Sequence, residues 1–229
     1  VGVGTNLKYY IMYGGGYSDI TPIRETTPAG AVTFAAVNGS AVITVTDTAH
    51  GAITGDFVTF SGAVGLGGAI TALILNREYQ VTVLTVNTYT ITASVLATAG
   101  DVGNGGASVV GTYQLNTGNS TQIPLSGWGA GGWSSGSWGT GVTSSATALR
   151  IWNAYNFGSD LIYGIRGDKL YYWAVASGLG SRGVAVSTLP GASDVPLMVD
   201  NLIVSDTSRF VIAFGTNDYG SSTKDPMLV

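Results

Sequence analysis

Cysteine is absent from the 229 residues of the chain, and histidine occurs once, as His50. The lack of cysteine excludes disulfides, thiol catalysis, zinc ribbons and iron–sulfur clusters. A single imidazole leaves no second histidine for a multi-histidine metal site, and a Ser-His-Asp triad has only His50 to use. No apolar run reaches the roughly 18 residues that a transmembrane helix needs, so we expect no such helix.

Charge is also scarce. Charged residues make up 10% of the chain, against about 25% in an ordinary globular domain. The nine lysines and arginines are scattered, the net charge is −4 and the pI is about 4.7. These values argue against a surface that coats nucleic acid, because such surfaces need clustered basic residues. Hydrophobic residues reach 45%, which is enough for a buried core and argues against global disorder.

The periodicity of the sequence predicts strands rather than helices. Short alternating segments rich in Val, Ile, Thr, Tyr and Phe are bounded by Gly, Asn and Asp, which is typical of an all-β protein. Residues 7–13 and 17–22 flank three glycines, which predicts a hairpin with a tight turn. Asn38-Gly39, the strongest two-residue hairpin signal, predicts another hairpin.

Residues 29–111 differ in composition from the rest of the chain. They carry few charges, and Thr and Ser supply most of their polar surface. Alternation at residues 41–46, 79–83 and 89–92 predicts strands. We expect this section to be a small β-sandwich or barrel, followed by a glycine-rich linker at residues 102–111.

Two hairpins are predicted in the last third, at residues 160–173 and 201–214. Both combine an apolar strand, a charged turn and an aromatic-rich strand. The spacing between their first residues, 160 and 201, matches the roughly 40–50-residue repeat of propeller blades. A β-propeller explains this better than a sandwich, because a propeller repeats a sheet radially. Too few blades are visible to close a ring, so we expect the chain to be part of a longer protein.

The predicted fold is therefore all-β, a partial β-propeller with an inserted small β-sandwich or barrel domain. Residues 1–28 supply the first propeller strands, residues 29–111 the inserted β-domain, and residues 112–229 the continued blades.

Tryptophan recurs at every fifth residue in a glycine-rich stretch, as Trp128, Trp133 and Trp138. This period matches neither helix nor strand, and indicates an irregular loop whose indoles lie in apolar pockets, at a subunit contact or within the chain. Stacking on a sugar ring is an alternative. Stacking on nucleic acid is disfavoured, because no Lys or Arg lies between Gly111 and Arg150.

Aromatic and glycine motifs recur at both ends of the chain. The first are Gly4-Thr5-Asn6-Leu7 and Gly15-Gly16-Tyr17-Ser18-Asp19-Ile20-Thr21-Pro22-Ile23-Arg24; the later ones are Arg150-Ile151-Trp152-Asn153, Asn156-Phe157-Gly158-Ser159-Asp160-Leu161, Leu170-Tyr171-Tyr172-Trp173, Asp200-Asn201-Leu202-Ile203-Val204 and Phe214-Gly215-Thr216-Asn217. With the Trp–Gly stretch, they resemble the tail nozzle (tail tubular, or stabilisation-type) proteins of short-tailed bacteriophages over residues 1–28 and 112–229. Ser159 departs from the family's Glu-Asp-Leu pattern. Residues 48–51, 55–62, 78–82 and 87–91 resemble a β-module inserted in many phage tail and fibre proteins.

The resemblance implies a structural virion protein of the phage tail and not an enzyme. Its fold would be a propeller platform that carries the inserted domain and assembles as a homohexameric ring. The implied partners are the phage adaptor protein above the ring and tail fibre or needle proteins around or below it. Genome DNA would pass through the lumen during ejection without sequence-specific binding. Neither a cofactor nor a membrane anchor is implied.

Two other functions stay open from the residues. One is a tail fibre or adhesin domain that binds host glycans, which would share the aromatic loops and the β-module. The other is a propeller glycoside hydrolase, which needs paired carboxylates. Its candidate carboxylates are Asp19, Asp160, Asp168, Asp200 and Asp206. Each of these also fits a hairpin turn or strand start, where Asp accepts hydrogen bonds from backbone N–H groups.

Three further motifs can be interpreted either as functional sites or as ordinary turns and loops. His50 has Asp56 and Ser61 near in sequence as triad partners, but Ala49-His50-Gly51 also reads as a turn before a strand. Arg166-Gly167-Asp168 is an adhesion tripeptide elsewhere and lies where a hairpin needs a turn. The glycine-rich residues 64–68 precede no clear helix, so they do not predict a phosphate loop. We therefore assign no catalytic, cofactor-binding or metal-binding residue.

Overall fold

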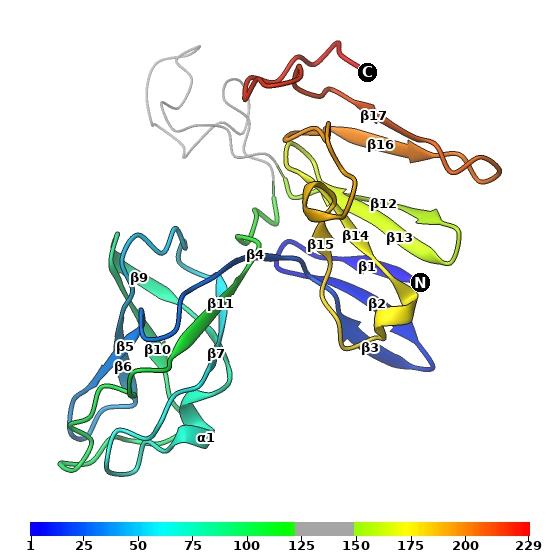
Figure 1. Cartoon of the computed structure of the whole chain (residues 1–229). Coiled ribbons are helices and arrows are strands. Elements are labelled where there is room, and N and C mark those ends of the chain that lie inside the picture. The colour runs from blue at the N-terminus through cyan, green and yellow to red at the C-terminus, as the bar shows by residue number, and fades with distance from the viewer. Residues whose placement is uncertain (122–148) are drawn as a thin grey trace, which may run out of the picture. The chain divides into compact units, whose positions relative to one another are not determined.

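The computed structural model describes residues 1–121 and 149–229. They form strands β1 to β17, one short helix, α1 (Ala72–Leu75), and two 3-10 turns, η1 (Val175–Ser177) and η2 (Val186–Thr188). The strands lie in several antiparallel sheets, and no sheet in the described ranges closes into a barrel (Figure 1). The prediction that the chain is nearly all β is confirmed. The predicted loop around Trp128, Trp133 and Trp138 lies outside the described residues.

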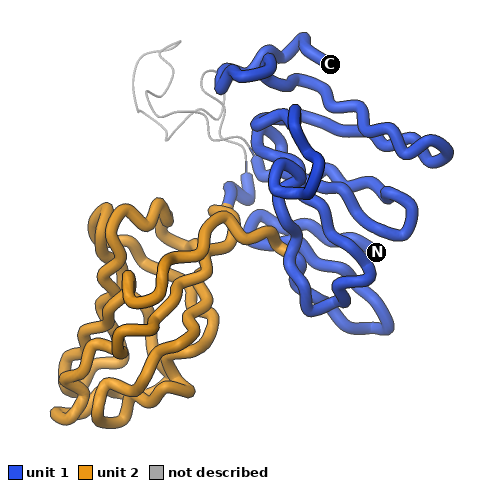
Figure 2. The backbone as a smooth tube through the Cα atoms, viewed as in Figure 1, with its two compact units in different colours: residues 1–20, 118–229 blue, residues 21–117 orange. Residues whose placement is uncertain are grey.

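The chain folds into two compact units (Figure 2). Unit 1 comprises residues 1–20 and 118–229, and unit 2 comprises residues 21–117. The sequence placed the boundaries of the inserted domain at residues 29 and 111 instead. The observed unit 2 extends beyond these residues at both ends. The reason is that β4 (Ile23–Thr26) pairs with β11 (Val110–Gln114), so both strands belong to a sheet of unit 2.

Unit 1 contains three antiparallel sheets. Their strand orders are β1-β2-β3, β12-β13-β14-β15 and β16-β17. The strand bounds are β1 Gly2–Gly4, β2 Tyr9–Tyr13, β3 Gly16–Asp19, β12 Trp152–Phe157, β13 Asp160–Ile165, β14 Leu170–Trp173, β15 Val184–Ala185, β16 Asn201–Val204 and β17 Val211–Phe214. The predicted hairpins correspond to β2–β3, β13–β14 and β16–β17. Gly14 and Gly15, with φ of 59° and 82°, form the first turn, which needs the left-handed conformations that glycine tolerates.

Aromatic rings join the N-terminal sheet of unit 1 to the second sheet. The ring of Tyr9 lies 5.0 Å from that of Trp152 and 5.1 Å from that of Tyr163. The Trp152 indole N–H donates to the carbonyl oxygen of Thr5 at 2.7 Å, and the Tyr163 hydroxyl donates to that of Ile20 at 2.5 Å. These contacts place residues 1–20 in the same unit as residues 118–229, although unit 2 separates them in sequence. A second cluster is formed by the buried residues Ile162, Leu170, Val199, Leu202 and Val204.

Unit 2 contains two four-stranded antiparallel sheets that share one core. Their strand orders are β5-β6-β10-β9 and β4-β11-β7-β8. The remaining bounds are β5 Thr33–Ala36, β6 Val42–Thr46, β7 Phe57–Ser61, β8 Glu78–Gln80, β9 Thr82–Thr85 and β10 Thr88–Thr92. Alternate residues of both sheets enter the core, among them Phe34, Ile43, Val45, Val58, Phe60, Tyr89, Ile91 and Tyr113. The turn at Asn38-Gly39 joins β5 to β6 as predicted, with Gly39 at φ 80°.

Residues 79–83 do not form the single strand that their alternation predicted. β8 pairs with β7 in one sheet, and β9 pairs with β10 in the other, so the chain crosses between the two sheets at Val81. The side chain of Val81 is buried. Because burial still alternates through the crossing, a pattern of period 2 does not reveal it.

Residues 102–109 are packed into unit 2 and are not the predicted linker. The Phe34 N–H donates to the carbonyl oxygen of Asn104 at 3.0 Å, and the Val64 N–H donates to that of Gly105 at 2.8 Å. Val109 is fully buried. Gly103 allows close packing against the backbone of Leu66, and Gly105 and Gly106 leave room for the side chains of Phe34 and Val64.

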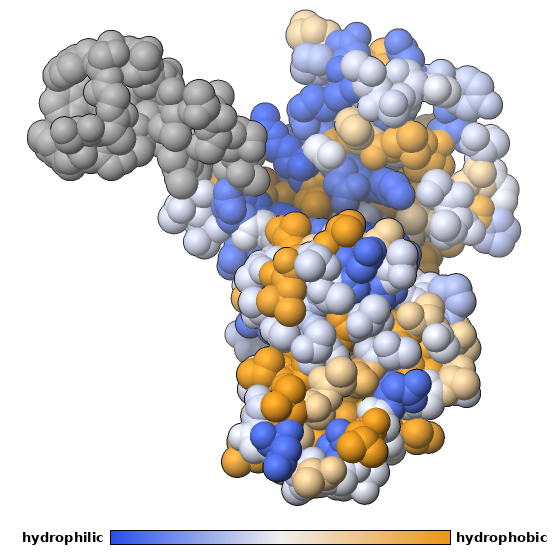
Figure 3. Space-filling view, turned by 90° about the vertical axis from the view of Figure 1, so that its left-hand side faces the viewer, coloured by the Kyte–Doolittle hydropathy of each residue, from blue (hydrophilic) through white to orange (hydrophobic). Residues whose placement is uncertain are grey.

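The surface of the chain carries few charges. On the lower part of the face in Figure 3, pale uncharged and orange apolar residues prevail over blue hydrophilic ones, in agreement with the charged fraction of 10%. Exposed apolar side chains of unit 2 include Val37, Leu73, Leu96 and Val102. None of the helices in the described ranges is long and apolar enough to cross a membrane.

Candidate functional site

His50 is a buried side chain whose two ring nitrogens both contact the backbone. Its Nε2 lies 3.1 Å from the carbonyl oxygen of Thr85, and its Nδ1 accepts a 3.1 Å hydrogen bond from the Ala52 N–H. Nδ1 therefore carries the lone pair and Nε2 carries the proton. The ring also packs edge-on against Tyr89, with 5.0 Å between centroids. Both nitrogens are engaged, so this histidine joins its own loop to the end of β9 and has neither nitrogen left to act as a catalytic base.

The two proposed triad partners of this histidine are engaged elsewhere or exposed. The Asp56 carboxylate accepts hydrogen bonds from the Thr117 N–H at 2.7 Å, the Thr117 hydroxyl at 3.0 Å and the Ile53 N–H at 2.9 Å. Ser61 lies exposed at the end of β7. Asp56 thus holds the last residue of unit 2 and orients no imidazole.

A buried hydrogen-bond chain crosses the core of unit 2. The Tyr113 hydroxyl donates to Asp47 Oδ2 at 2.5 Å, and the Tyr89 hydroxyl lies 2.7 Å from that of Tyr113. Because Tyr113 gives its proton to the carboxylate, Tyr89 donates to Tyr113. Asp47 follows β6 and Tyr89 lies in β10, whereas Tyr113 lies in β11 of the other sheet. These hydrogen bonds therefore join the two sheets of unit 2.

The surroundings of Asp47, Tyr89 and Tyr113 shift the pKa of each side chain. Burial raises the pKa of Asp47 above its ordinary value, while the hydrogen bond from Tyr113 acts in the opposite direction. Burial also raises the pKa of both tyrosines. Arg24 lies over the Tyr113 ring at 5.4 Å and donates to the carbonyl oxygen of His50 at 2.8 Å. No local pattern in the sequence indicated the hydrogen bonds among Asp47, Tyr113 and Tyr89, because these residues are far apart in the sequence.

The glycine-rich loop at residues 64–68 helps to form a cradle for a carboxylate of the same unit. Asp101 Oδ1 accepts hydrogen bonds from the N–H groups of Gly68 and Ile70, both at 2.9 Å. Its Oδ2 accepts from the Ala69 N–H at 2.9 Å and from the Thr98 N–H and hydroxyl at 2.7 and 3.0 Å. Convergent N–H groups of this kind bind anions. Here the anion is supplied by the protein and joins two loops.

We expect Asp101 to titrate far below an ordinary carboxyl. Removal from water acts to raise its pKa, but the hydrogen bonds from Thr98, Ile70 and Ala69 outweigh this effect and lower the pKa to about 2. Because the folded pKa is depressed, this group stabilises the fold above its ordinary pKa of 3.8, and the contribution is lost as the pH falls through about 2. The amide signals of Ala69 and Ile70, followed by NMR, should shift together with a midpoint of about 2. Asp101→Asn should abolish that transition, and a midpoint at 3.8 would contradict the assignment.

Asp19 and Asp160, two of the candidate carboxylates of unit 1, hold strands and turns in place. Asp19 pairs with Lys8 at 2.9 Å and with Arg182 at 2.5 Å. Asp160 accepts hydrogen bonds from the Tyr172 hydroxyl and from the Val175 N–H, and these two bonds lower its pKa.

The last two carboxylates of that set differ in their surroundings. Asp200 pairs with Lys224 at 2.9 Å and lies 3.9 Å from Arg166 Nε. Asp206 lies exposed in the turn between β16 and β17. No group of three or more His, Cys, Asp or Glu side chains in the described residues is placed to hold a metal ion.

Arg166-Gly167-Asp168 forms the turn between β13 and β14. Gly167, at φ 82°, donates its N–H to the carbonyl oxygen of Val199 at 2.8 Å, and the Val199 N–H donates to that of Asp168 at 3.0 Å. The Tyr171 hydroxyl lies 3.3 Å from the Asp168 carboxylate. The tripeptide is thus bonded to the segment before β16, as a plain turn would be, and does not project freely as an adhesion loop would.

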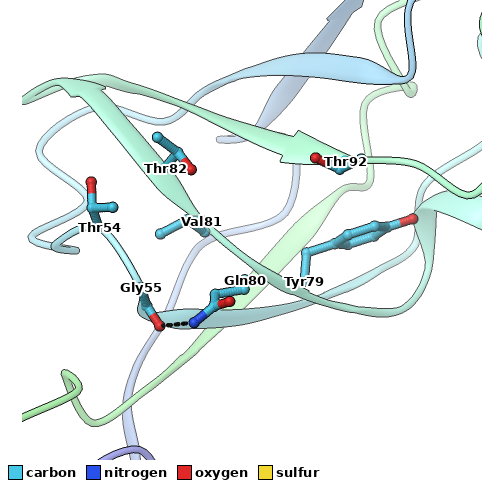
Figure 4. A pocket seen from close by; sticks show the side chains of 7 residues that line it. All are labelled: Thr54, Gly55, Tyr79, Gln80, Val81, Thr82 and Thr92. Carbon is cyan, nitrogen blue, oxygen red and sulfur yellow. Dashed lines mark hydrogen bonds between the residues drawn. The ribbon is translucent and has the colours of Figure 1, made fainter. Parts of the chain in front are cut away.

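An open hollow of about 510 Å³ lies on unit 2 where the chain crosses between the sheets (Figure 4). We call it the Val81 hollow, after the residue at the crossing. It is lined by Thr54, Gly55, Tyr79, Gln80, Val81, Thr82 and Thr92. None of these residues is charged, and they combine hydroxyl and amide groups with one aromatic ring. No pattern in the sequence predicted this hollow, because alternation does not reveal a crossing between sheets.

No family model and no curated protein matches the chain. Among solved structures, the chain is similar to the phage phi92 endosialidase, with a TM-score of 0.33 and 16% identity, over 94% of this chain and 33% of that one. The chain thus spans about a third of the length of that enzyme.

Proposed function

We propose that the chain is a structural component of a phage tail, and more narrowly part of the tail nozzle ring. The observation that carries this proposal is how its polar groups are used. His50, Asp56 and Asp101 in unit 2, and Asp19 and Asp160 in unit 1, each hold strands or loops together through the hydrogen bonds and ion pairs described above. Such a chain uses its few charged and titratable groups for rigidity.

The residues that resemble nozzle proteins support the proposal through their positions in unit 1. Of the motif at residues 15–24, residues 15–20 lie in the turn and second strand of the first hairpin, whereas residues 21–24 lie in unit 2 and enter β4. Residues 150–161 and 170–173 contribute to β12, β13 and β14, and residues 201–204 form β16. Trp152 of these motifs packs between two sheets, against Tyr9. We infer that these sheets are propeller blades, and that unit 2 is the inserted module.

The proposed mechanism is mechanical. Stiff antiparallel sheets tied by aromatic contacts would form a homohexameric ring that docks to the adaptor. Tail fibre or needle proteins would bind around it, and the genome would pass through the lumen. A net charge of −4 fits a lumen to which phosphates do not adhere.

Class-averaged electron microscopy of the intact particle tests this proposal. We expect a sixfold ring on the tail axis, into which the sheets of unit 1 fit. Antibody fragments against unit 2 give a matched control, because they should decorate the same ring with the same symmetry. A threefold spike or a free monomer would contradict the proposal and favour a tail fibre.

A further inference from the structure

We propose that the Val81 hollow of unit 2 binds a neutral saccharide. This site goes beyond the proposed role in a tail ring and does not depend on it, because a ring without sugar binding and sugar binding without a ring are separable results.

The hollow is a consequence of the sheet crossing. β9 pairs with β10 only from Thr82 onward, with Thr82 opposite Thr90, so β10 continues past the start of β9 to Thr92. The loop before β7 closes the other side, since the Gly55 N–H donates to the carbonyl oxygen of Val81 at 2.9 Å. The hollow lies between these segments, and its lining residues come from the loop before β7, from the crossing and from the end of β10 (Figure 4).

Several groups at the hollow are already engaged, which fixes its shape. The Gln80 amide donates to the carbonyl oxygen of Gly55 at 2.9 Å, and the Thr54 hydroxyl accepts a 3.0 Å hydrogen bond from the Val83 N–H. The Tyr79 hydroxyl donates to the carbonyl oxygen of Ile74, which anchors its ring. The walls are thus held before any ligand arrives, and such preorganisation favours binding.

Other groups at the rim remain available to a ligand. Thr82 and Thr92 are exposed, and their hydroxyls both donate and accept hydrogen bonds. The Gln80 side chain has one amide hydrogen and its carbonyl oxygen beyond the bond to Gly55. The half-buried ring of Tyr79 adds an apolar surface beside these groups (Figure 4).

This combination selects the class of ligand. A sugar presents hydroxyls to hydroxyl and amide groups and C–H faces to an aromatic ring, and the volume of about 510 Å³ lies in the range of small-molecule sites. No lysine or arginine lines the hollow to pair with a carboxylate or phosphate, and no aspartate or glutamate lines it to pair with a cation. The ligand is therefore neutral.

The test uses the whole chain on an array of defined neutral and carboxylate-bearing oligosaccharides. We expect retention on neutral glycans, and at least a tenfold loss of affinity in the double variant Thr82→Val, Thr92→Val. Valine keeps the shape of threonine and favours strands, so these exposed positions should tolerate it. Thr46→Val, at an exposed position of β6 away from the hollow, is the matched control and should bind as the unchanged protein does.

A second measurement keeps the proposal testable if the double variant does not fold. In the unchanged protein, the methyl NMR signals of Thr54, Thr82 and Thr92 should shift when the retained neutral glycan is added, while that of Thr46 should not. Retention of acidic glycans alone, absence of all retention, unaltered affinity of the double variant, or shifts confined to other residues would each overturn the proposal.

Discussion

Gly62→Ala is expected to lower the free energy of unfolding of unit 2 by about 3 kcal/mol or more. Gly62 follows β7 at φ 72°, where a residue with a side chain is strained by about 1–2 kcal/mol. A Cβ at this position would also lie 2.2 Å from the carbonyl oxygen of Ser108, which is backbone and cannot rotate away. Relieving that overlap moves residues 102–109 from their packed position, and overpacking of this kind costs about 1–3 kcal/mol.

Gly39→Ala is the matched control for this substitution. Gly39 is also left-handed, at φ 80°, but no atom lies within 4 Å of the added Cβ. It should therefore show only the conformational cost, about 1–2 kcal/mol. The difference between the two variants measures the close approach of Gly62 to Ser108.

Hydrogen–deuterium exchange of peptides from residues 21–117 is the suitable measurement. Tryptophan fluorescence would follow other parts of the chain, because this range contains no tryptophan. Where exchange requires opening of the unit, about 1.4 kcal/mol corresponds to a tenfold faster rate. Gly62→Ala should thus exchange more than a hundredfold faster, and rates equal to those of Gly39→Ala would show that the two backbones do not meet.

Tyr113→Phe is the second variant with a large expected effect, a loss of about 2–3 kcal/mol at neutral pH. It removes the hydroxyl that joins Asp47 to Tyr89 and leaves a buried carboxylate without its donor. Hydrogen bonds to charged groups contribute about 1.5–3 kcal/mol, and an unsatisfied buried acceptor adds its desolvation penalty. Tyr89→Phe removes only the outer donor, so it should cost about 1 kcal/mol.

The cost of Tyr113→Phe should depend on pH in a defined direction. The folded pKa of Asp47 is raised, so its contribution to stability is fully present below the unfolded pKa of 3.8 and is lost as the pH rises through the folded value. Loss of the Tyr113 hydrogen bond raises that pKa further. The variant should therefore lose more stability at about pH 7 than at about pH 4, where an ordinary aspartate begins to protonate.

The ratio of variant to unchanged exchange rates at the two pH values tests this, because intrinsic exchange cancels in the ratio. Tyr89→Phe removes no hydrogen bond to the carboxylate and should show a much weaker pH dependence. An equal ratio at both pH values for Tyr113→Phe would mean that Asp47 keeps its charge state throughout.

Local signals in the sequence predicted the hairpins well. Gly14-Gly15 form the two-residue turn that they indicated, because such a turn is decided by backbone conformations within the turn itself. Asn38-Gly39 lies in the predicted connection between β5 and β6, which is longer, since Ala36 pairs with Ile43. Ile43 and Val45 are buried on one face as their alternation predicted. These features depend on neighbours in sequence.

Features that depend on distant segments were not predictable in this way. The boundaries of unit 2 are set by the pairing of β4 with β11, which no pattern within either strand reveals. The contact of Asp47 with Tyr113 joins two sheets, and a lone aspartate after a strand gives no hint of a buried partner. The Val81 hollow is missed for a related reason, since alternation continues while the strand changes its sheet.

The paired strands at the ends of unit 2 determine how tension would act on the chain. The Leu115 N–H donates to the carbonyl oxygen of Pro22 at 3.0 Å, and the ladder continues inward from Ile23 opposite Gln114 to Thr26 opposite Thr112. A force that pulls on residues 20 and 118 reaches both strands at the same end of this antiparallel pair. The load then falls on one hydrogen bond at a time and not on all of them together. A pull on residues 20 and 118 would therefore separate β4 from β11 one hydrogen bond after another, starting at the end near Pro22 and Leu115. The insertion thus adds little to the tensile strength of the polypeptide.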